Sequence, residues 1–183
     1  LDVLHFLSAG AASFARGFDQ LVRLQPHEIQ FGILKRLRGT PIIRHTQPFG
    51  LVFDPAPPYT ILATDRIAFA DMQRLVRFAR YWDLVANSGR FAHTLPLLLG
   101  ETPFANFMAF SDWLYGKTDA TFRIALDRLA GLVGQWLKAC GHDDKAVVLL
   151  LASDYAGRHS EHEGTRKSAT VAAPKRQVQH LAA

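Results

Sequence analysis

The sequence of 183 residues predicts an α+β fold that is mostly α-helical. Apolar residues recur at helical spacing through most of the chain after residue 69. Before that point, one helical pattern leads directly into a short apolar stretch, and two further short stretches flank a proline-rich turn. With 49% hydrophobic and 20% charged residues, the chain has the composition of a globular domain.

The N-terminal part is expected to hold one helix, three short strands and a short second helix. Residues 13–24 show an amphipathic pattern that ends at Gln25-Pro26, because the residue before a proline is driven out of the helical conformation. The apolar stretch 28–34 predicts a strand, which makes half of an α/β repeat with the helix before it. The stretches 51–53 and 59–64 predict a small hairpin around an Asp-Pro-Ala-Pro-Pro turn.

The second half is expected to be all-helical. An apolar face over 69–86 predicts a long helix with a C-cap at 87–89, and further helices are expected at about 102–115, 120–139 and 145–156. The stretch 158–183 is polar and has no periodicity, so we expect it to be disordered. The predicted units are therefore 1–50, 51–157 and a tail at 158–183.

The candidate ligand-binding residues are Lys35, Arg36, Gly39 and Thr40, which follow the predicted strand. Gly39 permits a tight turn, the hydroxyl of Thr40 can cap the short helix expected over 41–47, and a proline suits its first position. Basic side chains beside helix N–H groups suit a carboxylate or a phosphate. The spacing is not that of a P-loop. From the residues alone, a structural turn and a ligand-facing rim both stay open.

Residue types argue against several other kinds of site. Cys140 is the only cysteine, which excludes an internal disulfide and any all-cysteine metal or iron–sulfur site made by this chain alone. His159 and His162 have the spacing of a helical ligand pair, but they lie in the stretch expected to be disordered. The aromatic series between Phe78 and Trp113 has helical spacing, so we expect it to form core rather than a base-stacking surface. No apolar run approaches the roughly 18 residues of a membrane span, and we expect a cytoplasmic protein without a membrane partner.

Four separated blocks of sequence together give a family resemblance. They are PHEIQFGILKRLRGTPI at 26–42, LVFDPAPPYTILAT at 51–64, RLVRFARYWDLVANSGRF at 74–91 and FSDWLYGKT at 110–118. In this order they resemble the C-terminal part of cobalamin-binding-domain-containing radical SAM proteins. The resemblance covers about residues 12–155, and it is to the end of the radical SAM barrel followed by the helical C-terminal domain of unknown function.

The resemblance implies that residues 1–50 are the last unit of a partial (β/α) barrel. Such a barrel would hold a [4Fe–4S] cluster and S-adenosylmethionine, with cobalamin on a separate N-terminal domain. Because the C-terminal ends of barrel strands face the active site, Lys35, Arg36, Gly39 and Thr40 would line its rim near a cofactor or an unidentified small-molecule substrate. The helical domain would close or cover that site.

The chain also departs from the family pattern. The family holds its cluster with three cysteines in a C-x-x-x-C-x-x-C loop, and neither this loop nor three cysteines is present. We therefore expect no cofactor and no catalysis from this chain alone, and we expect its partner to be the cobalamin-binding and radical SAM core, in cis or in trans. The opening residues match only poorly the strand that the family would have there, as a natural fragment, a truncation or a frameshift would explain.

Two alternatives differ in class. A net charge of +5 and a pI near 9.7 would suit a basic module that binds nucleic acid, but no nucleic-acid-reading motif is present and we do not expect this partner. The chain would otherwise be an inactive gene remnant. A lone barrel unit would leave the strand at 28–34 with an unpaired edge, so we also expect the isolated chain to self-associate in light scattering.

Overall fold

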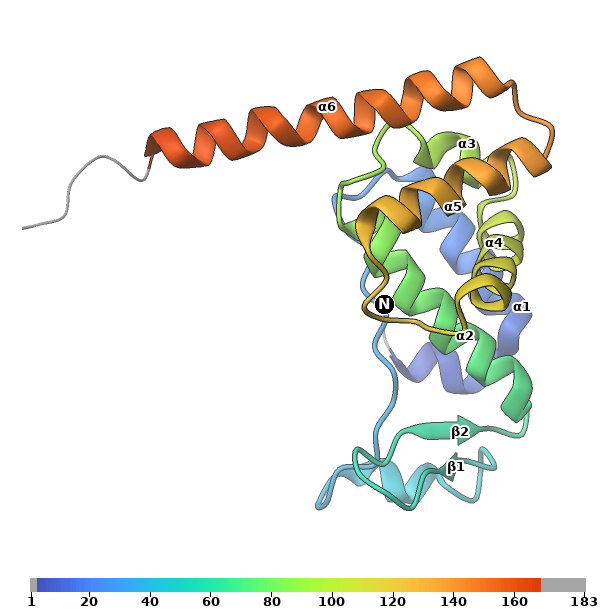
Figure 1. Ribbon diagram of the computed structural model, residues 1–183. Coiled ribbons are helices and arrows are strands. Elements are labelled where there is room, and N and C mark those ends of the chain that lie inside the picture. The colour runs from blue at the N-terminus through green and yellow to red at the C-terminus, as the bar shows by residue number, and fades with distance from the viewer. Residues whose placement is uncertain (1–2, 169–183) are drawn as a thin grey trace, which may run out of the picture.

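The computed structural model describes residues 3–168, with side chains described for 10–156. The molecule is a helical body with a small hairpin at one end and a long helix that projects from the other (Figure 1). The helices are α1 (Val3–Arg23), α2 (Phe69–Trp82), α3 (Leu95–Leu99), α4 (Pro103–Thr118), α5 (Leu126–Ala139) and α6 (Asp144–Ser168). The prediction of a mostly helical α+β fold is confirmed.

The predicted hairpin is also present. β1 (Val52–Phe53) pairs antiparallel with β2 (Ile61–Ala63), and the short 3-10 helix η1 (Pro41–His45) precedes them. The turn between the strands contains a cis peptide bond at Pro57-Pro58. The hairpin is joined to the helical body because α2 packs against β2.

The predicted strand at 28–34 is wrong. Within the described residues, the stretch 25–34 is an extended strap without regular structure, so α1 is not followed directly by a strand. Only its end pairs with the hairpin, where Lys35 forms an isolated antiparallel bridge with Thr60. The apolar residues of this stretch pack on helices instead, because Ile29 is buried and Phe31 lies against the rings of the core. A short apolar run fits either environment equally well.

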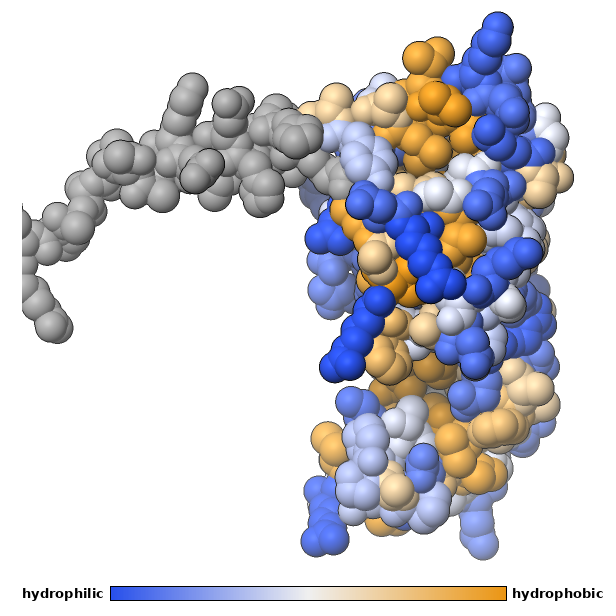
Figure 2. Space-filling view, viewed as in Figure 1, coloured by the Kyte–Doolittle hydropathy of each residue, from blue (hydrophilic) through white to orange (hydrophobic). Residues whose placement is uncertain are grey.

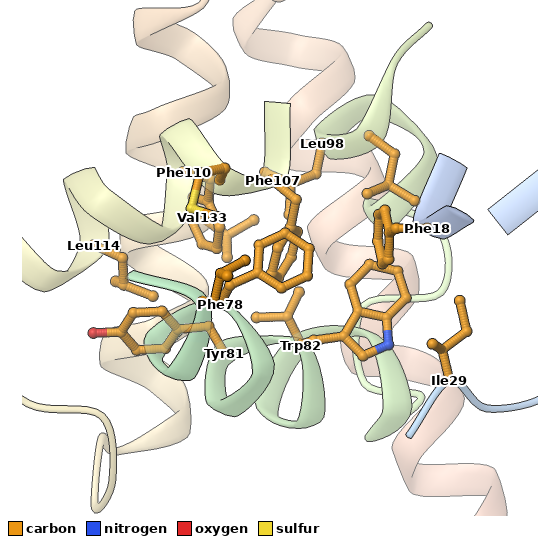
Figure 3. Close-up of a cluster of buried hydrophobic side chains, with 14 of the residues drawn as sticks. Phe18, Ile29, Phe78, Tyr81, Trp82, Leu98, Phe107, Phe110, Leu114 and Val133 are labelled. Atoms are coloured by element: carbon orange, nitrogen blue, oxygen red, sulfur yellow. The ribbon is translucent and has the colours of Figure 1, made fainter. Parts of the chain in front are cut away.

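The side chain of Asn87 takes the place of a neighbouring strand. Its Oδ1 accepts a hydrogen bond from the backbone N–H of Ile29 at 3.2 Å, and its Nδ2 donates to the carbonyl of Ile29 at 3.0 Å. The same Oδ1 accepts from the indole N–H of Trp82 at 3.0 Å. Figure 3 shows the indole nitrogen turned toward Ile29. Asn87 thus satisfies the backbone of the strap where no sheet does.

Asn87 reaches this position because α2 continues into a π-helix, η2 (Asp83–Asn87). A wider helical turn is rare and rotates the residues after it relative to an α-helix. The C-cap expected at 87–89 is therefore only partly right: Gly89 has the positive φ of 68° that suits glycine, while Asn87 faces the strap. Phe69, expected on the apolar face, is 56% exposed at the first position of α2.

The core is a continuous group of aromatic rings (Figure 3). The ring centroid of Phe18, on α1, lies 4.8 Å from that of Trp82 and 5.1 Å from that of Phe78, both on α2. The ring centroid of Phe107, on α4, lies 5.0 Å from that of Phe78 and 5.1 Å from that of Trp82. Most of these pairs are edge-to-face, which is a favourable arrangement for ring quadrupoles. The expectation that the aromatic series forms core is confirmed.

The helical half differs from prediction in its boundaries. α3 was not expected, and α5 begins at Leu126 because the stretch 120–125 is a loop with Arg123 at a φ of 58°. α6 continues to Ser168, so it includes 158–168 of the stretch expected to be disordered. Residues 169–183 lie outside the described residues.

The start of α3 is tied to α6 by a buried carboxylate. Asp154, 7% exposed, accepts hydrogen bonds from the backbone N–H of His93 at 2.7 Å and of Thr94 at 3.2 Å. It also accepts from the hydroxyl of Thr94. A carboxylate suits this place because the first N–H groups of a helix have no partner within the helix.

The Asn87→Ala substitution tests the strap. We expect it to lower the free energy of unfolding by about 2–4 kcal/mol, because the N–H and carbonyl of Ile29 and the indole N–H of Trp82 all lose a partner. The measurement is urea unfolding followed by circular dichroism. The exposed Gln135→Ala on α5 is the control, with an expected change within about 0.5 kcal/mol. Equal effects of the two variants would contradict the role given to Asn87.

The Asp154→Ala substitution tests the connection between α3 and α6. We expect a loss of about 2–4 kcal/mol, since two backbone N–H groups and a buried hydroxyl lose their acceptor. The neighbouring Ser153→Ala serves as control, because its exposed hydroxyl donates only to the carbonyl of Leu149. Thermal unfolding of both variants should separate them clearly, and a Ser153→Ala loss as large as that of Asp154→Ala would rule out this explanation.

Candidate interaction surface

The predicted site residues Lys35 and Arg36 are exposed and sit on the edge of the hairpin. The backbone N–H of Arg36 donates to the carbonyl of Tyr59 at 3.0 Å, and the guanidinium of Arg36 lies over the ring of Phe53, 5.6 Å from its centroid. The bridge from Lys35 to Thr60, just before β2, and the hydrogen bond to Tyr59 fix where the backbone of this pair lies. Both residues are exposed, and neither side chain forms a salt bridge within the described part of the chain.

Gly39 and Thr40 form the turn that follows. Gly39 has a φ of 78°, which glycine adopts without strain, as the sequence predicted. The predicted hydroxyl cap of Thr40 is wrong: its hydroxyl donates to the carbonyl of Leu37 at 2.7 Å and makes no cap bond to η1. The hydroxyl closes the turn before the helix instead. Because η1 has only five residues, helix N–H groups contribute little here.

We call this part of the molecule the basic end. It comprises the loop and η1 over 35–45 together with β1, and it lies opposite α6 (Figure 1). The 25 residues from 29 to 53 contain four basic residues, Lys35, Arg36, Arg38 and Arg44, and no Asp or Glu. Three aliphatic side chains are exposed in the same stretch: Leu37 at 55%, Ile43 at 62% and Val52 at 52%.

The combination of charge and exposed aliphatic groups is typical of an interaction surface. Single exposed apolar residues are common, whereas three lie here in one short stretch that also holds four basic residues. Figure 2 shows this end with hydrophobic groups beside strongly hydrophilic ones. The sequence located the basic residues, while the exposure of the aliphatic residues becomes visible only in the structure.

A second polar network joins α2 to α4 on the side of the helical body. The guanidinium of Arg74 donates to Asp112 at 2.6 and 3.0 Å and lies 3.5 Å from Asp71. The hydrogen bond with Asp112 is the main cause that raises the pKa of Arg74. Arg77 stacks on Tyr115, 4.5 Å from the ring centroid. These paired charges stabilise the packing of α2 against α4.

The described residues contain no cluster of metal-ligating side chains. No group of three or more His, Cys, Asp or Glu side chains in the described part of the chain could hold a metal ion. Cys140 is exposed at the end of α5. The side chains of His159 and His162 lie outside the described residues. None of the described helices has both the length and the apolar composition of a membrane span.

A family model matches residues 47–179 and is described as a protein of unknown function, DUF4080. The chain belongs to this family. The DUF4080 region contains the hairpin and α2 to α6, whereas α1, the strap and most of the basic end precede it. The prediction of a helical domain of unknown function is confirmed at this level, and the radical SAM parent stays a prediction.

Comparisons with curated proteins and with solved structures find no match. The DUF4080 domain shares one core with the residues that precede it. Its most distinctive feature is that residues outside the family match are built into its core, since Phe18 and Phe31 pack against Phe78 and Trp82.

The stability of the domain at alkaline pH should depend on Tyr81. Its hydroxyl is buried and donates to the carbonyl of Ala120 at 2.8 Å, and burial raises the pKa of Tyr81 above its ordinary value of 10.0. The unfolded chain loses this proton first as the pH rises, so the stabilisation is complete below pH 10.0 and is lost above it. We expect unfolding measured from pH 8 to about 11 to show a steeper loss for the unmodified protein than for Tyr81→Phe. Parallel profiles would contradict this assignment.

Proposed function

We propose that this DUF4080 domain is a non-catalytic interaction domain that packs against a radical SAM barrel and covers its active site. The observation that supports it most is the basic end, where four bases and three exposed aliphatic side chains lie together. A surface with this composition suits a protein partner that presents both apolar groups and an anion.

The sequence blocks that carry the family resemblance support the same face. Two of the four blocks, 26–42 and 51–64, form the strap, the basic end and the hairpin. The other two lie in α2, η2 and α4, which hold the strap in place. The four blocks therefore include most of the basic end and parts of the helical body that carries it.

The proposed roles follow from where each residue lies. Lys35 and Arg36 would contact the anionic group of a substrate or of S-adenosylmethionine, because their charged groups are exposed on a fixed backbone. Gly39 and Thr40 would shape the turn beside it. The substrate would be a small molecule, and the remaining core would be supplied in cis or in trans.

The cofactors of the resembling family do not fit this chain by itself. A [4Fe–4S] cluster needs three thiolates in such enzymes, and the chain has one cysteine, exposed at the end of α5. The cluster, the S-adenosylmethionine and any cobalamin would therefore be held by the barrel and its neighbouring domain. Within the complex, the contribution of this chain would be to exclude water and to position an anion.

The nucleic-acid alternative has less support. Binding single strands uses aromatic faces on which bases stack, and most aromatic rings of this chain belong to its core or pack against it. The continuous core also argues against a decayed gene remnant, because random substitution first destroys such packing.

The experiment has two steps. The DNA upstream of the codon for Leu1 is read in all three frames for a C-x-x-x-C-x-x-C loop, which we expect to find there or in a neighbouring gene. The complete protein or complex is then reconstituted with its cluster, and S-adenosylmethionine cleavage is measured for Lys35→Glu/Arg36→Glu. We expect at least a tenfold loss of rate.

Arg90→Glu is the matched control, because Arg90 is an exposed base outside the basic end. Its rate should stay within about twofold of the unmodified protein. Absence of a cluster loop from the locus, or equal rates for the two charge-reversal variants, would contradict the proposal.

A further inference from the structure

The strap borders a groove that is separate from the basic end. It consists of two adjoining hollows of about 360 and 430 Å³ between the strap, the end of α2 with η2, and α3. Glu28 and Asn87 line both hollows, so the two form one continuous strap groove. Its size falls within the range of small-molecule sites.

One half of the strap groove is mainly apolar. Its walls come from four different parts of the chain and include Val22, Pro26, Ile29, Trp82, Leu95 and Leu99. Most of these belong to the packed core or lie against it. The floor is held rigid by the hydrogen bonds of Asn87 to the strap and to the indole of Trp82. A preformed apolar wall reduces the entropy that a ligand must lose on binding.

The other half is acidic. Glu28 and Asp83 line it, and no Lys or Arg side chain lines either hollow among the described residues. Each carboxylate is hydrogen-bonded to a side-chain amide: Asp83 accepts from Asn87 at 2.9 Å and Glu28 accepts from Gln30 at 3.1 Å. Neither forms a salt bridge within the described part of the chain. His27, the other titratable residue, lines the apolar half.

This charge distribution is notable in a protein with a net charge of +5. Amide partners occupy only one acceptor site on each carboxylate, so further lone pairs remain for a donor. An ammonium group has three donors and no acceptor, which matches two carboxylates at one end of an apolar groove.

We propose that the strap groove binds a small organic cation with an apolar body and one ammonium group. The apolar body lies against Trp82, Leu95 and Leu99, and the ammonium group lies between Glu28 and Asp83. Binding here is independent of the proposed function, because none of the lining residues belongs to the basic end.

Isothermal titration of the full chain tests the proposal with 2-phenylethylammonium as the probe. The neutral 2-phenylethanol and the anionic phenylacetate have similar apolar bodies and separate the effect of charge. We expect saturable binding of the ammonium and at least tenfold weaker binding of the alcohol. Phenylacetate should not bind at concentrations up to about 10 mM, which is on the order of the weakest Kd that titration resolves.

Variants then locate the site. Glu28→Gln and Asp83→Asn should each lower the affinity for 2-phenylethylammonium at least tenfold. Glu101 is an exposed acid that lines neither hollow, so Glu101→Gln should leave this affinity within about twofold of the unmodified protein. Ala92→Phe places a ring in the apolar half and should abolish binding, with circular dichroism confirming that each variant is folded. No saturable binding, equal affinity for phenylacetate, or binding insensitive to both acid variants would overturn the proposal.

Discussion

Aromatic rings from four separate segments pack together and hold the helices, the strap and the basic end in one body. Phe18 comes from α1, Phe31 from the strap, Phe78 and Trp82 from α2, and Phe107 from α4. Each large ring buries a large apolar area, which makes it a main contributor to the stability of the core. Edge-to-face pairs also restrict how the helices are oriented. Residues that precede the DUF4080 match thereby become part of the same core as the matched region. Packing on this core determines where the strap and the basic end lie.

The hydrogen bonds of Asn87 then fix the backbone of the strap on this core. An extended segment away from a sheet has N–H and carbonyl groups to satisfy, and burying them unpaired costs about as much as a lost hydrogen bond. The amide of Asn87 forms hydrogen bonds with both groups of Ile29, and six residues later Lys35 pairs with Thr60, the residue before β2. These two fixed points determine where the exposed bases of the next turn emerge. The same amide forms the boundary between the halves of the strap groove, so one side chain supports both surfaces.

Much of the helical half could be predicted from sequence because periodicity over a long segment reflects burial on one face. The hairpin was also predictable, since the Asp-Pro-Ala-Pro-Pro turn separates two short apolar runs. The stretch 28–34 was misread because a short apolar run has no period long enough to distinguish strand from strap. Its decisive partner, Asn87, lies 58 residues away, and no local pattern shows such a pairing. The basic side chains of Lys35 and Arg36 are visible in the sequence, whereas the exposure of Leu37 and Ile43 depends on tertiary structure.

A single body that joins α1 and the strap to the DUF4080 region is the central claim, because only then is the basic end held in a fixed place. Native-state hydrogen exchange tests it without any substitution. The amides of α1 after Phe14 and those of α4 should open with the same free energy, equal to that of global unfolding, because both helices share one aromatic core. Opening of α1 at a much lower free energy, with α4 still protected, would contradict the account.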